Sequence, residues 1–263
     1  MKKLLLPVLT LLFFNHCIGQ QLFQLAPPIL QYHSAFFKDS AMASLQFAQP
    51  GTQIFYTLNG EEPTQKDAVY RKPVVIKKSL ITLKAKVFGK GFLPSETIQA
   101  TFIKDGLKIK SIEESSSNEK YPGNGVTTLL DNEGGIADMH NKNFLGYQQD
   151  SVEINVTLTK KQSIHSVLLD FLRDEGSWIF PPQKITLFYF DDVKKEFEMM
   201  SKKEIIADTI AKANGCVFIM LKTGTKVSAN KFKIVVQPLQ SIPGWHPGKG
   251  KQAWLFIDEI KIY

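Results

Sequence analysis

Residues 54–64 read IFYTLNGEEPT, an apolar and aromatic run followed by Asn-Gly, two acids, a proline and a threonine. Alternate side chains of an extended strand face opposite sides, so one side here carries Ile54, Tyr56 and Leu58. Asn59-Gly60 tolerates the positive φ of a tight turn, and Pro63 fixes the direction in which the chain leaves it. The Glu61-Glu62 pair then lies on a solvated turn. The stretch predicts a strand and a turn, not a catalytic site.

The same pattern extends along most of the chain. Short alternating runs rich in Val, Ile, Thr, Phe and Tyr are separated by Gly, Pro, Asn and Asp, as in residues 80–89 and 96–104. A second set of such runs extends from residues 151–158 to residues 253–263. These runs are typical of β-strands, and only SKKEIIADTIAKA (201–213) has a helical pattern. The sequence therefore predicts an all-β protein.

A polar stretch rich in Ser, Lys and Gly separates the two sets of strands. We place the connection at residues 105–112. Residues 20–104, about 85 residues, have the right length for an immunoglobulin-like β-sandwich. Residues 113–263, about 150 residues, suit a larger jelly-roll sandwich. The prediction is two β domains in series.

The N-terminus, MKKLLLPVLTLLFFNHCIG (1–19), has two lysines before an apolar run too short to span a bilayer. It predicts a signal peptide cleaved after Gly19 and export to the periplasm, the cell surface or the medium. Lipid attachment at Cys17 is the alternative, although the bulky residues before it fit a lipoprotein signal poorly. We expect no transmembrane span in the mature chain. Its remaining cysteine, Cys216, lies in an apolar run and is expected to be a buried small side chain.

The net charge of +7 is unevenly distributed. Residues 20–104 hold 10 Lys and Arg against 5 Asp and Glu, whereas residues 105–263 hold 20 against 20. The lysines of the first half follow predicted strands and do not cluster with aromatic residues. We therefore expect no nucleic-acid binding and interpret the lysines as an exposed sheet face.

The first half resembles a known domain family. IFYTLNGEEPT, then AVYRKPVVI (68–76) and LITLKAKVFGKGFLPSETIQATF (80–102), are similar to the immunoglobulin-like domain on the C-terminal side of chitobiases and β-hexosaminidases. Asn59 stands where that family usually has Asp, which keeps the turn chemistry. The resemblance covers about residues 25–104 and implies a supporting domain beside a glycosidase catalytic domain.

The second half resembles the discoidin-like, coagulation-factor type C domains at the ends of bacterial hexosaminidases and fucosidases. LLDNEGGIADMHNKNFLGY (129–147) has the spacing of their opening loop, carried by Asp131, Asp138, Phe144, Gly146 and Tyr147. FLRDEGSWIFPP (171–182) and GWHPGKGKQAWLFIDEI (244–260) match two further signatures. The resemblance implies a galactose-binding-like jelly roll over residues 113–263, often with a structural calcium and, in many relatives, with glycan binding.

The calcium expected from this resemblance needs six to eight oxygen ligands. The side chains that we expect to supply them are Asp131 at the start of the loop, Glu259 in the last strand and, less directly, Asp138. Asn132 stands where relatives often have Gly, which could alter the carbonyl geometry. The alternative is that Asp131 only caps a turn.

A sugar-binding site needs an aromatic side chain on which the sugar can stack and a few polar groups that hydrogen-bond its hydroxyls. Candidates lie in two Gly- and Pro-flanked loops, where binding residues tend to occur; they are Arg173, Asp174, Trp178, Trp245 and His246. Either tryptophan of these loops could instead fill the core or hold its loop, and Trp254 is expected to be a core residue.

An enzyme is not expected. The hexosaminidase family catalyses with an adjacent Asp-Glu pair, but neighbours on a strand point to opposite faces, so Asp258 and Glu259 should not share a substrate. The catalytic barrel of that family needs about 250 residues by itself. The sequence also lacks a zinc-protease motif, a nucleophile elbow and a phosphate-binding loop.

Together these features predict a secreted, non-catalytic carbohydrate-binding accessory protein whose partners are a glycan and, in addition, a glycosidase. The alternative is a structural or protein-interaction module that docks a partner glycosidase or surface complex. A divergent glycosidase is the third reading and predicts turnover of nitrophenyl glycosides.

Overall fold

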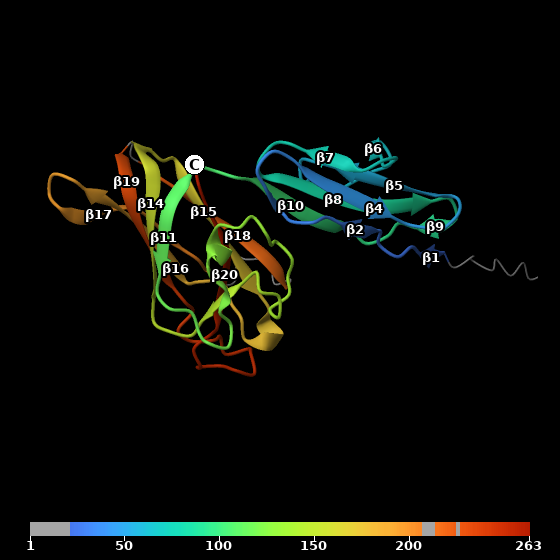
Figure 1. Ribbon diagram of the computed structural model, residues 1–263. Coiled ribbons are helices and arrows are strands. Elements are labelled where there is room, and N and C mark those ends of the chain that lie inside the picture. The colour runs from blue at the N-terminus through green and yellow to red at the C-terminus, as the bar shows by residue number, and fades with distance from the viewer. Residues whose placement is uncertain (1–21, 207–213, 225–226) are drawn as a thin grey trace, which may run out of the picture.

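The computed structural model describes residues 22–206, 214–224 and 227–263. The predicted signal peptide (1–19) and Cys17 lie outside these residues. Within them the secondary structure consists of strands and two 3₁₀ turns, η1 (Thr127–Leu129) and η2 (Glu175–Ser177). The all-β prediction is confirmed. The strands form two bodies that lie end to side, joined by the chain between β10 and β11 (Figure 1).

The first sandwich pairs a five-stranded sheet with a three-stranded one. The larger sheet has the order β3 (Phe36–Phe37), β10 (Ile98–Lys104), β8 (Ile81–Gly89), β5 (Thr52–Thr57) and β6 (Ala68–Val69). The smaller sheet has the order β2 (Ile29–Gln31), β4 (Ala41–Gln46) and β7 (Val74–Ile76). A short parallel pair, β1 (Phe23–Gln24) with β9 (Phe92–Leu93), lies at one edge of this sandwich.

Strand β8 shows why this sequence forms a two-faced sheet. Its inward residues Leu83, Ala85 and Val87 are fully buried in the core of the first sandwich. Between them, the ammonium groups of Lys84 and Lys86 lie 3.5 and 3.6 Å from the Glu62 carboxylate on the outer face. Lys84 and Lys86 thus lie on a sheet face, as predicted, whereas other lysines of the first half, such as Lys66, Lys78 and Lys90, lie in turns or bends.

The quoted stretch 54–64 forms the end of β5 and the loop after it. The Asn59 side chain accepts a hydrogen bond from the Glu61 amide (3.1 Å), and Gly60 has a φ of +79°. The Thr57 hydroxyl closes the loop by donating to the Glu61 carbonyl at 2.7 Å. The turn interpretation of this stretch is therefore correct.

The second sandwich also consists of two sheets. The five-stranded sheet has the order β11 (Ile109–Glu114), β14 (Val152–Ser163), β19 (Ser228–Gln237), β16 (Lys184–Asp191) and β17 (Glu196–Glu204). The four-stranded sheet has the order β13 (Leu145–Tyr147), β20 (Leu255–Ile262), β15 (Ser166–Arg173) and β18 (Gly215–Lys222). The short β12 (Gly123–Val126) leads into η1.

Two local predictions need correction. Strand β11 begins at Ile109, inside the range 105–112 predicted as the connection, and it pairs with β14. It is an edge strand with little burial, so its sequence lacks the apolar run that marks an inner strand. The helical pattern predicted for residues 201–213 is wrong for its first residues, because Ser201–Glu204 ends β17; residues 207–213 lie outside the described part of the chain.

The two sandwiches share an apolar contact. Phe36 and Phe37 are neighbours on β3, so their side chains point to opposite faces. Phe37 belongs to the core of the first sandwich, whereas Phe36 packs with Leu168 of the second. The Phe36 and Phe218 rings meet edge to face at 6.0 Å. The junction is therefore a packed interface.

Hydrogen bonds reinforce this junction. The Ala35 amide donates to the Gly134 carbonyl at 3.0 Å, and the Tyr32 hydroxyl donates to the Gly135 carbonyl at 3.0 Å. At the other side, the Tyr263 hydroxyl donates to the Lys104 carbonyl at 2.7 Å. The first two bonds hold loop 131–137 of the second sandwich against the first, and the third ties the C-terminal Tyr263 to the end of β10.

Candidate functional site

The five residues predicted to bind sugar come together in one loop cluster. Arg173 ends β15, Asp174 and Trp178 flank η2, and Trp245 and His246 lie in the long loop between β19 and β20. The Trp178 and Trp245 rings each meet the His246 ring edge to face, at 6.4 and 5.6 Å. Figure 1 shows the β19–β20 loop at the end of the second sandwich opposite the chain connection.

Arg173 lies inside this cluster, not on its surface. Its side chain is buried, and its Nε donates to a carboxylate oxygen of Glu175 at 2.9 Å, with a second contact from the guanidinium to the same oxygen. A buried guanidinium paired in this way is a structural element, since removing either partner would leave an uncompensated charge. The prediction that Arg173 reads a sugar hydroxyl does not fit this position.

Asp174 and His246 also hold the loop. The Asp174 carboxylate accepts hydrogen bonds from the Ser177 hydroxyl (2.7 Å) and from the Asn214 side-chain amide (3.1 Å). The buried His246 uses both ring nitrogens: Nδ1 accepts from the Gly248 amide at 3.0 Å, so Nε2 donates to the Glu175 carbonyl at 2.9 Å. Neither side chain is placed as a first contact for a ligand.

The three tryptophans differ in exposure. Trp178 is half-buried, with a φ of +64°, and the Lys251 ammonium lies 4.9 Å from the centre of its ring. Trp254 is half-buried and packs beside Tyr121 and Phe256, close to the core role expected for it. Trp245 keeps 54% of its surface exposed. It is therefore the aromatic platform that the loop cluster offers to solvent.

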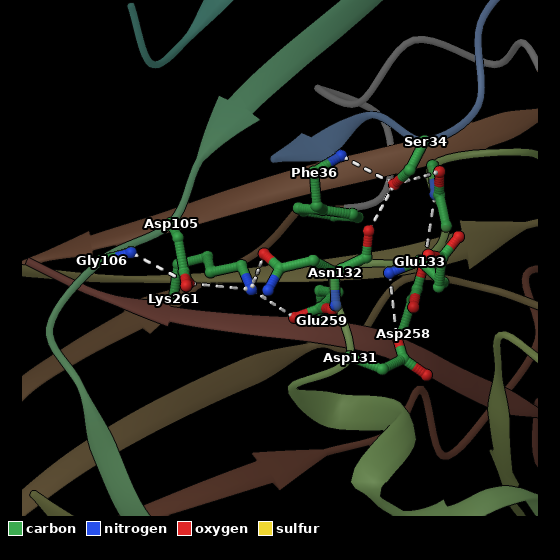
Figure 2. A network of polar contacts seen from close by, with 12 residues as sticks. Ser34, Phe36, Asp105, Gly106, Asp131, Asn132, Glu133, Asp258, Glu259 and Lys261 are labelled. Carbon is green, nitrogen blue, oxygen red and sulfur yellow. Dashed lines mark hydrogen bonds and ion pairs between the residues drawn. The ribbon is translucent and has the colours of Figure 1, made fainter. Parts of the chain in front are cut away.

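Two of the three residues predicted to bind calcium, Asp131 and Glu259, lie elsewhere, at the junction of the two sandwiches (Figure 2). Asp131 and Glu259 come together: each carboxyl group influences the pKa of the other, and Glu259 also accepts from the Asn132 amide. Asp138 is exposed and accepts from the His140 amide at 2.9 Å, which is a turn contact. Asn132 adopts a φ of +62°, a conformation that Asn tolerates.

A cationic side chain already occupies this site. Figure 2 shows the Lys261 ammonium pointing toward the Glu259 carboxylate, which it meets at 2.6 Å, and toward the Asn132 side-chain oxygen at 2.9 Å. Among the described residues, no group of three or more His, Cys, Asp or Glu side chains could hold a metal ion. The residues present therefore do not fit the calcium site that the resemblance implied.

Burial sets the protonation of this region. It raises the pKa of Glu259 to about 7, while Lys261 acts in the opposite direction. Burial also raises the pKa of Asp131, which its hydrogen bonds to the Glu133 amide and to Glu259 partly offset. Both carboxyl groups lie near the single ammonium group of Lys261. One positive charge compensates only one carboxylate, so the site disfavours ionisation of both carboxyl groups at once.

The alternation expected for Asp258 and Glu259 does not hold. The pairing of β20 with β15 shifts register between Ile257 and Ile260, and both isoleucines face the core of the second sandwich. The two acids therefore both face away from this core, toward loop 131–137, where Asp258 accepts from the Gly135 amide at 3.1 Å. Both are fully buried, so no substrate reaches them in this structure.

Asp170 on β15 is a second buried acid beside this pair. It has no exposed surface, and neither of its carboxyl oxygens has a well-formed hydrogen bond to the described part of the chain. Burial raises the pKa of Asp170 well above its usual range, and the negative charge of Glu259 adds to this effect. Burial and Asp170 raise the pKa of Asp258 in the same direction. The two aspartates are thus held in a region that favours the protonated form.

A cavity of about 500 Å³ lies between the sandwiches, lined in part by Tyr32, Thr101, Gly135, Cys216 and Phe218. Cys216 is the free cysteine expected from the sequence. Burial raises the pKa of its thiol, and the nearby Asp170 adds to the shift. A thiol held neutral in this way is a poor nucleophile, so Cys216 acts as a packing residue.

Sequence reasoning missed Asp170 and Lys261. A usable signal was present in β20, where three charged residues, Asp258, Glu259 and Lys261, interrupt an otherwise apolar strand. Charged residues are rarely buried unless they are paired, so three in one inner strand indicate an internal polar network. Asp170 lies in the similarly apolar β15 and carried the same signal.

The comparisons with known proteins concern the fold. Residues 44–102 match the Fn3-associated family; this stretch lies within residues 20–104, where an immunoglobulin-like domain is expected, and the type of that domain stays a prediction. No curated protein matches the chain. Among the described residues, no helix is long and apolar enough to cross a membrane.

Several solved structures are similar at low identity. The family 32 carbohydrate-binding module of Streptococcus pneumoniae EndoD matches at 16% identity and a TM-score of 0.39, over 60% of this chain and 96% of that one. The C-terminal domain of a Bacteroides fragilis chitobiase matches at 18% and 0.35, over 59% and 91%. A Ruminococcus gnavus fucosidase matches at 14% and 0.37, over 58% of this chain and 25% of its own. Likenesses at these scores assign no ligand or activity to this chain.

Proposed function

We propose that this protein is an exported, non-catalytic module that binds a glycan through the loop cluster around Trp245. The observation that carries the proposal is the exposed indole of Trp245, held by a loop that is internally bonded. His246 anchors the loop to the Glu175 carbonyl at 2.9 Å, and the Ile242 amide donates to the Lys251 carbonyl at 2.9 Å. A rigid aromatic platform binds the apolar face of a sugar with little loss of conformational entropy.

Three polar side chains of this loop cluster already have hydrogen-bond partners within the protein. Arg173, Asp174 and His246 are bonded inside the loop and stabilise it. The exposed Lys249 and Lys251 lie in the same β19–β20 loop as Trp245, and the Lys251 ammonium lies over the neighbouring Trp178 ring. Stacking on Trp245 together with hydrogen bonds from these lysines is the mode of binding that we propose. Export rests on residues 1–19, which lie outside the described part of the chain.

The test is a titration of the full-length mature protein with galactose-, hexosamine- and uronic-acid-bearing oligosaccharides, followed by calorimetry and tryptophan fluorescence. Trp245→Ala should weaken binding about tenfold or more, because it removes the stacking surface. Phe23→Ala is the matched control, since Phe23 is 76% exposed on the first sandwich, outside this loop. Binding that is unchanged in Trp245→Ala, or no binding to any glycan, would contradict the proposal.

A protein-docking function is the second candidate, and one surface favours it. On the three-stranded sheet of the first sandwich, Met42 and Val75 are direct cross-strand neighbours and keep 59% and 55% of their surfaces exposed. Exposed apolar pairs on a sheet are a feature of interaction surfaces. Co-purification with a glycosidase that is lost in Met42→Ser/Val75→Ser but retained in Trp245→Ala would support docking over glycan binding.

A further inference from the structure

Lys261 occupies an unusual place for a lysine. It lies on β20, in the four-stranded sheet of the second sandwich, and is only 2% exposed. A buried ammonium is costly unless it is paired and hydrogen-bonded. The groups around this ammonium therefore show how the cost of burying it is compensated.

Three oxygens from three segments surround the Lys261 ammonium (Figure 2). They are Glu259 Oε2 on the same strand at 2.6 Å, Asn132 Oδ1 in loop 131–137 at 2.9 Å and Asp105 Oδ1 in the connection at 3.3 Å. The first two oxygens accept hydrogen bonds from the ammonium, and Asp105 forms an ion pair with it. The Phe36 ring of the first sandwich lies 5.5 Å from the nitrogen and adds a cation–π contact.

A calcium ion does not fit beside this ammonium. Calcium takes about six to eight oxygens, but one Glu259 oxygen is occupied by Lys261 and the other by the Asn132 amide. The Asp131 Oδ1 atom already accepts from the Glu133 amide at 2.9 Å. A divalent cation here would also stand next to a buried positive charge, and the two would repel strongly at low dielectric.

We infer that the Lys261 ammonium takes the place of a divalent cation in this domain, so that the second sandwich holds loop 131–137 without calcium. The same group has a further role, because Asp105 belongs to the connection between the sandwiches. One side chain thus joins β20, loop 131–137 and the connection. This loop in turn bonds the first sandwich, since the Ser34 hydroxyl donates to the Asn132 carbonyl at 2.7 Å.

The first test uses the full-length mature protein with calcium chloride as the probe. We expect the same Tm in EDTA and in millimolar calcium, and no saturable heat of binding at this site. Calcium binding that disappears in Glu259→Gln would place the ion on this carboxylate and overturn the inference. Absence of binding, or binding that Glu259→Gln does not alter, supports it.

The second test removes the ammonium while keeping the length of the side chain. Lys261→Met leaves the buried Glu259 carboxylate without its cation, and we expect the Tm to fall on the order of 10 °C. Lys202→Met is the matched control, because Lys202 also lies on a strand but is 57% exposed, and its contact to Glu204 is 3.9 Å long. The expected change for this control is no more than about 2 °C.

A double variant keeps the test decisive if Lys261→Met does not fold. Glu259→Gln/Lys261→Met removes both charges, so it should recover part of the Tm lost in the single variant, because no uncompensated carboxylate remains. A Lys261→Met protein with the Tm of the wild type would overturn the inference. So would a double variant that is less stable than Lys261→Met alone.

Discussion

Gly135 is the residue on which the junction most directly depends. It has a φ of +71°, and a Cβ at this position would overlap the Cβ of Ala35 in the first sandwich. Gly135→Ala should therefore lower the free energy of unfolding through both backbone strain and steric overlap, by about 2–4 kcal/mol in total. Urea denaturation measures this change.

Gly91→Ala separates the two causes. Gly91 has a similar φ of +83° but no atom within 4 Å of the position of its Cβ. We expect it to lose only the backbone component, about 1 kcal/mol. Equal losses in the two variants would mean that the sandwiches do not meet at Gly135 as described.

Asp170 predicts how stability depends on pH. Burial and the charge of Glu259 hold the pKa of Asp170 above that of the unfolded chain, although the contact with Asp258 partly offsets this effect. The folded state then binds its proton more tightly than the unfolded state does. The stabilisation is complete below the ordinary carboxyl pKa of about 4 and is lost as the pH rises through the folded pKa. The Tm should accordingly be lower at pH 8.5 than at pH 5.5.

Asp170→Asn checks this assignment, because an amide of the same shape cannot ionise. The variant should show a weaker fall of Tm between pH 5.5 and pH 8.5 than the wild type in calorimetry. Asp138→Asn, an exposed position beside the His140 amide, should leave the slope unchanged. An unaltered slope in Asp170→Asn would assign the pH dependence to other groups.

At the level of single residues, the sequence predicted which side chains lie close together better than it predicted what each of them does. Asp131 and Glu259 do come together, and the five loop residues do form one cluster. Local spacing could not show that both ring nitrogens of His246 are used internally, because the Glu175 carbonyl that binds Nε2 comes from a loop 71 residues away in the sequence. Nor could it show that Lys261 fills the cation position, which depends on Asp105 lying far away in the sequence.

Among the elements, the β19–β20 loop has the most direct functional consequence. Its exposed charges are Lys249 and Lys251, residues 238–254 contain no acid, and the Glu175 carboxylate of the adjoining loop is paired with Arg173. A ligand carrying a carboxylate should therefore bind this loop more tightly than a neutral one of the same size. Lys249→Met/Lys251→Met should weaken binding of a uronic-acid oligosaccharide about threefold or more, and added salt should do the same.

The comparison ligand is a neutral oligosaccharide of equal length, whose affinity should change little in this double variant. Equal affinities for the charged and neutral ligands in the wild type, with no effect of salt, would contradict the assignment. Calorimetry at two ionic strengths gives both measurements.

Elements were predictable where one face is buried and the other is solvated. Strand β8 alternates cleanly because its lysines face outward, whereas the eight residues of β15 and of β20 are buried on both faces. Edge strands carried the weakest signal, and β11 was assigned in part to the connection for that reason. Residues 201–204, the start of the stretch 201–213 predicted as helical, belong to β17, which is also an edge strand with few apolar residues.

For the whole molecule, the packed junction predicts that the two sandwiches unfold together. Phe36 is 3% exposed and contacts Phe218 and Lys261 of the second sandwich. Phe36→Ala should remove these contacts, cost about 3–5 kcal/mol and divide a single calorimetric transition into two. Its neighbour is the matched control: Phe37→Ala should destabilise the core of the first sandwich and leave the contacts of Phe36 in place.

Two transitions in the wild-type protein would show that the sandwiches are thermodynamically independent. A single transition in Phe36→Ala would show that the remaining junction contacts, such as the Ala35–Gly134 and Tyr263–Lys104 hydrogen bonds, are sufficient for coupling. Both outcomes are read directly from the calorimetric trace.

The Trp245 loop and the connection lie at opposite ends of the second sandwich (Figure 1). Strand β14, with 12 residues, spans about 40 Å at the usual rise per residue, which gives the scale of this separation. A polysaccharide bound at the loop would therefore stay at a fixed distance from anything attached to the first sandwich. Such a geometry suits a spacer that sets the distance between a surface and its anchor.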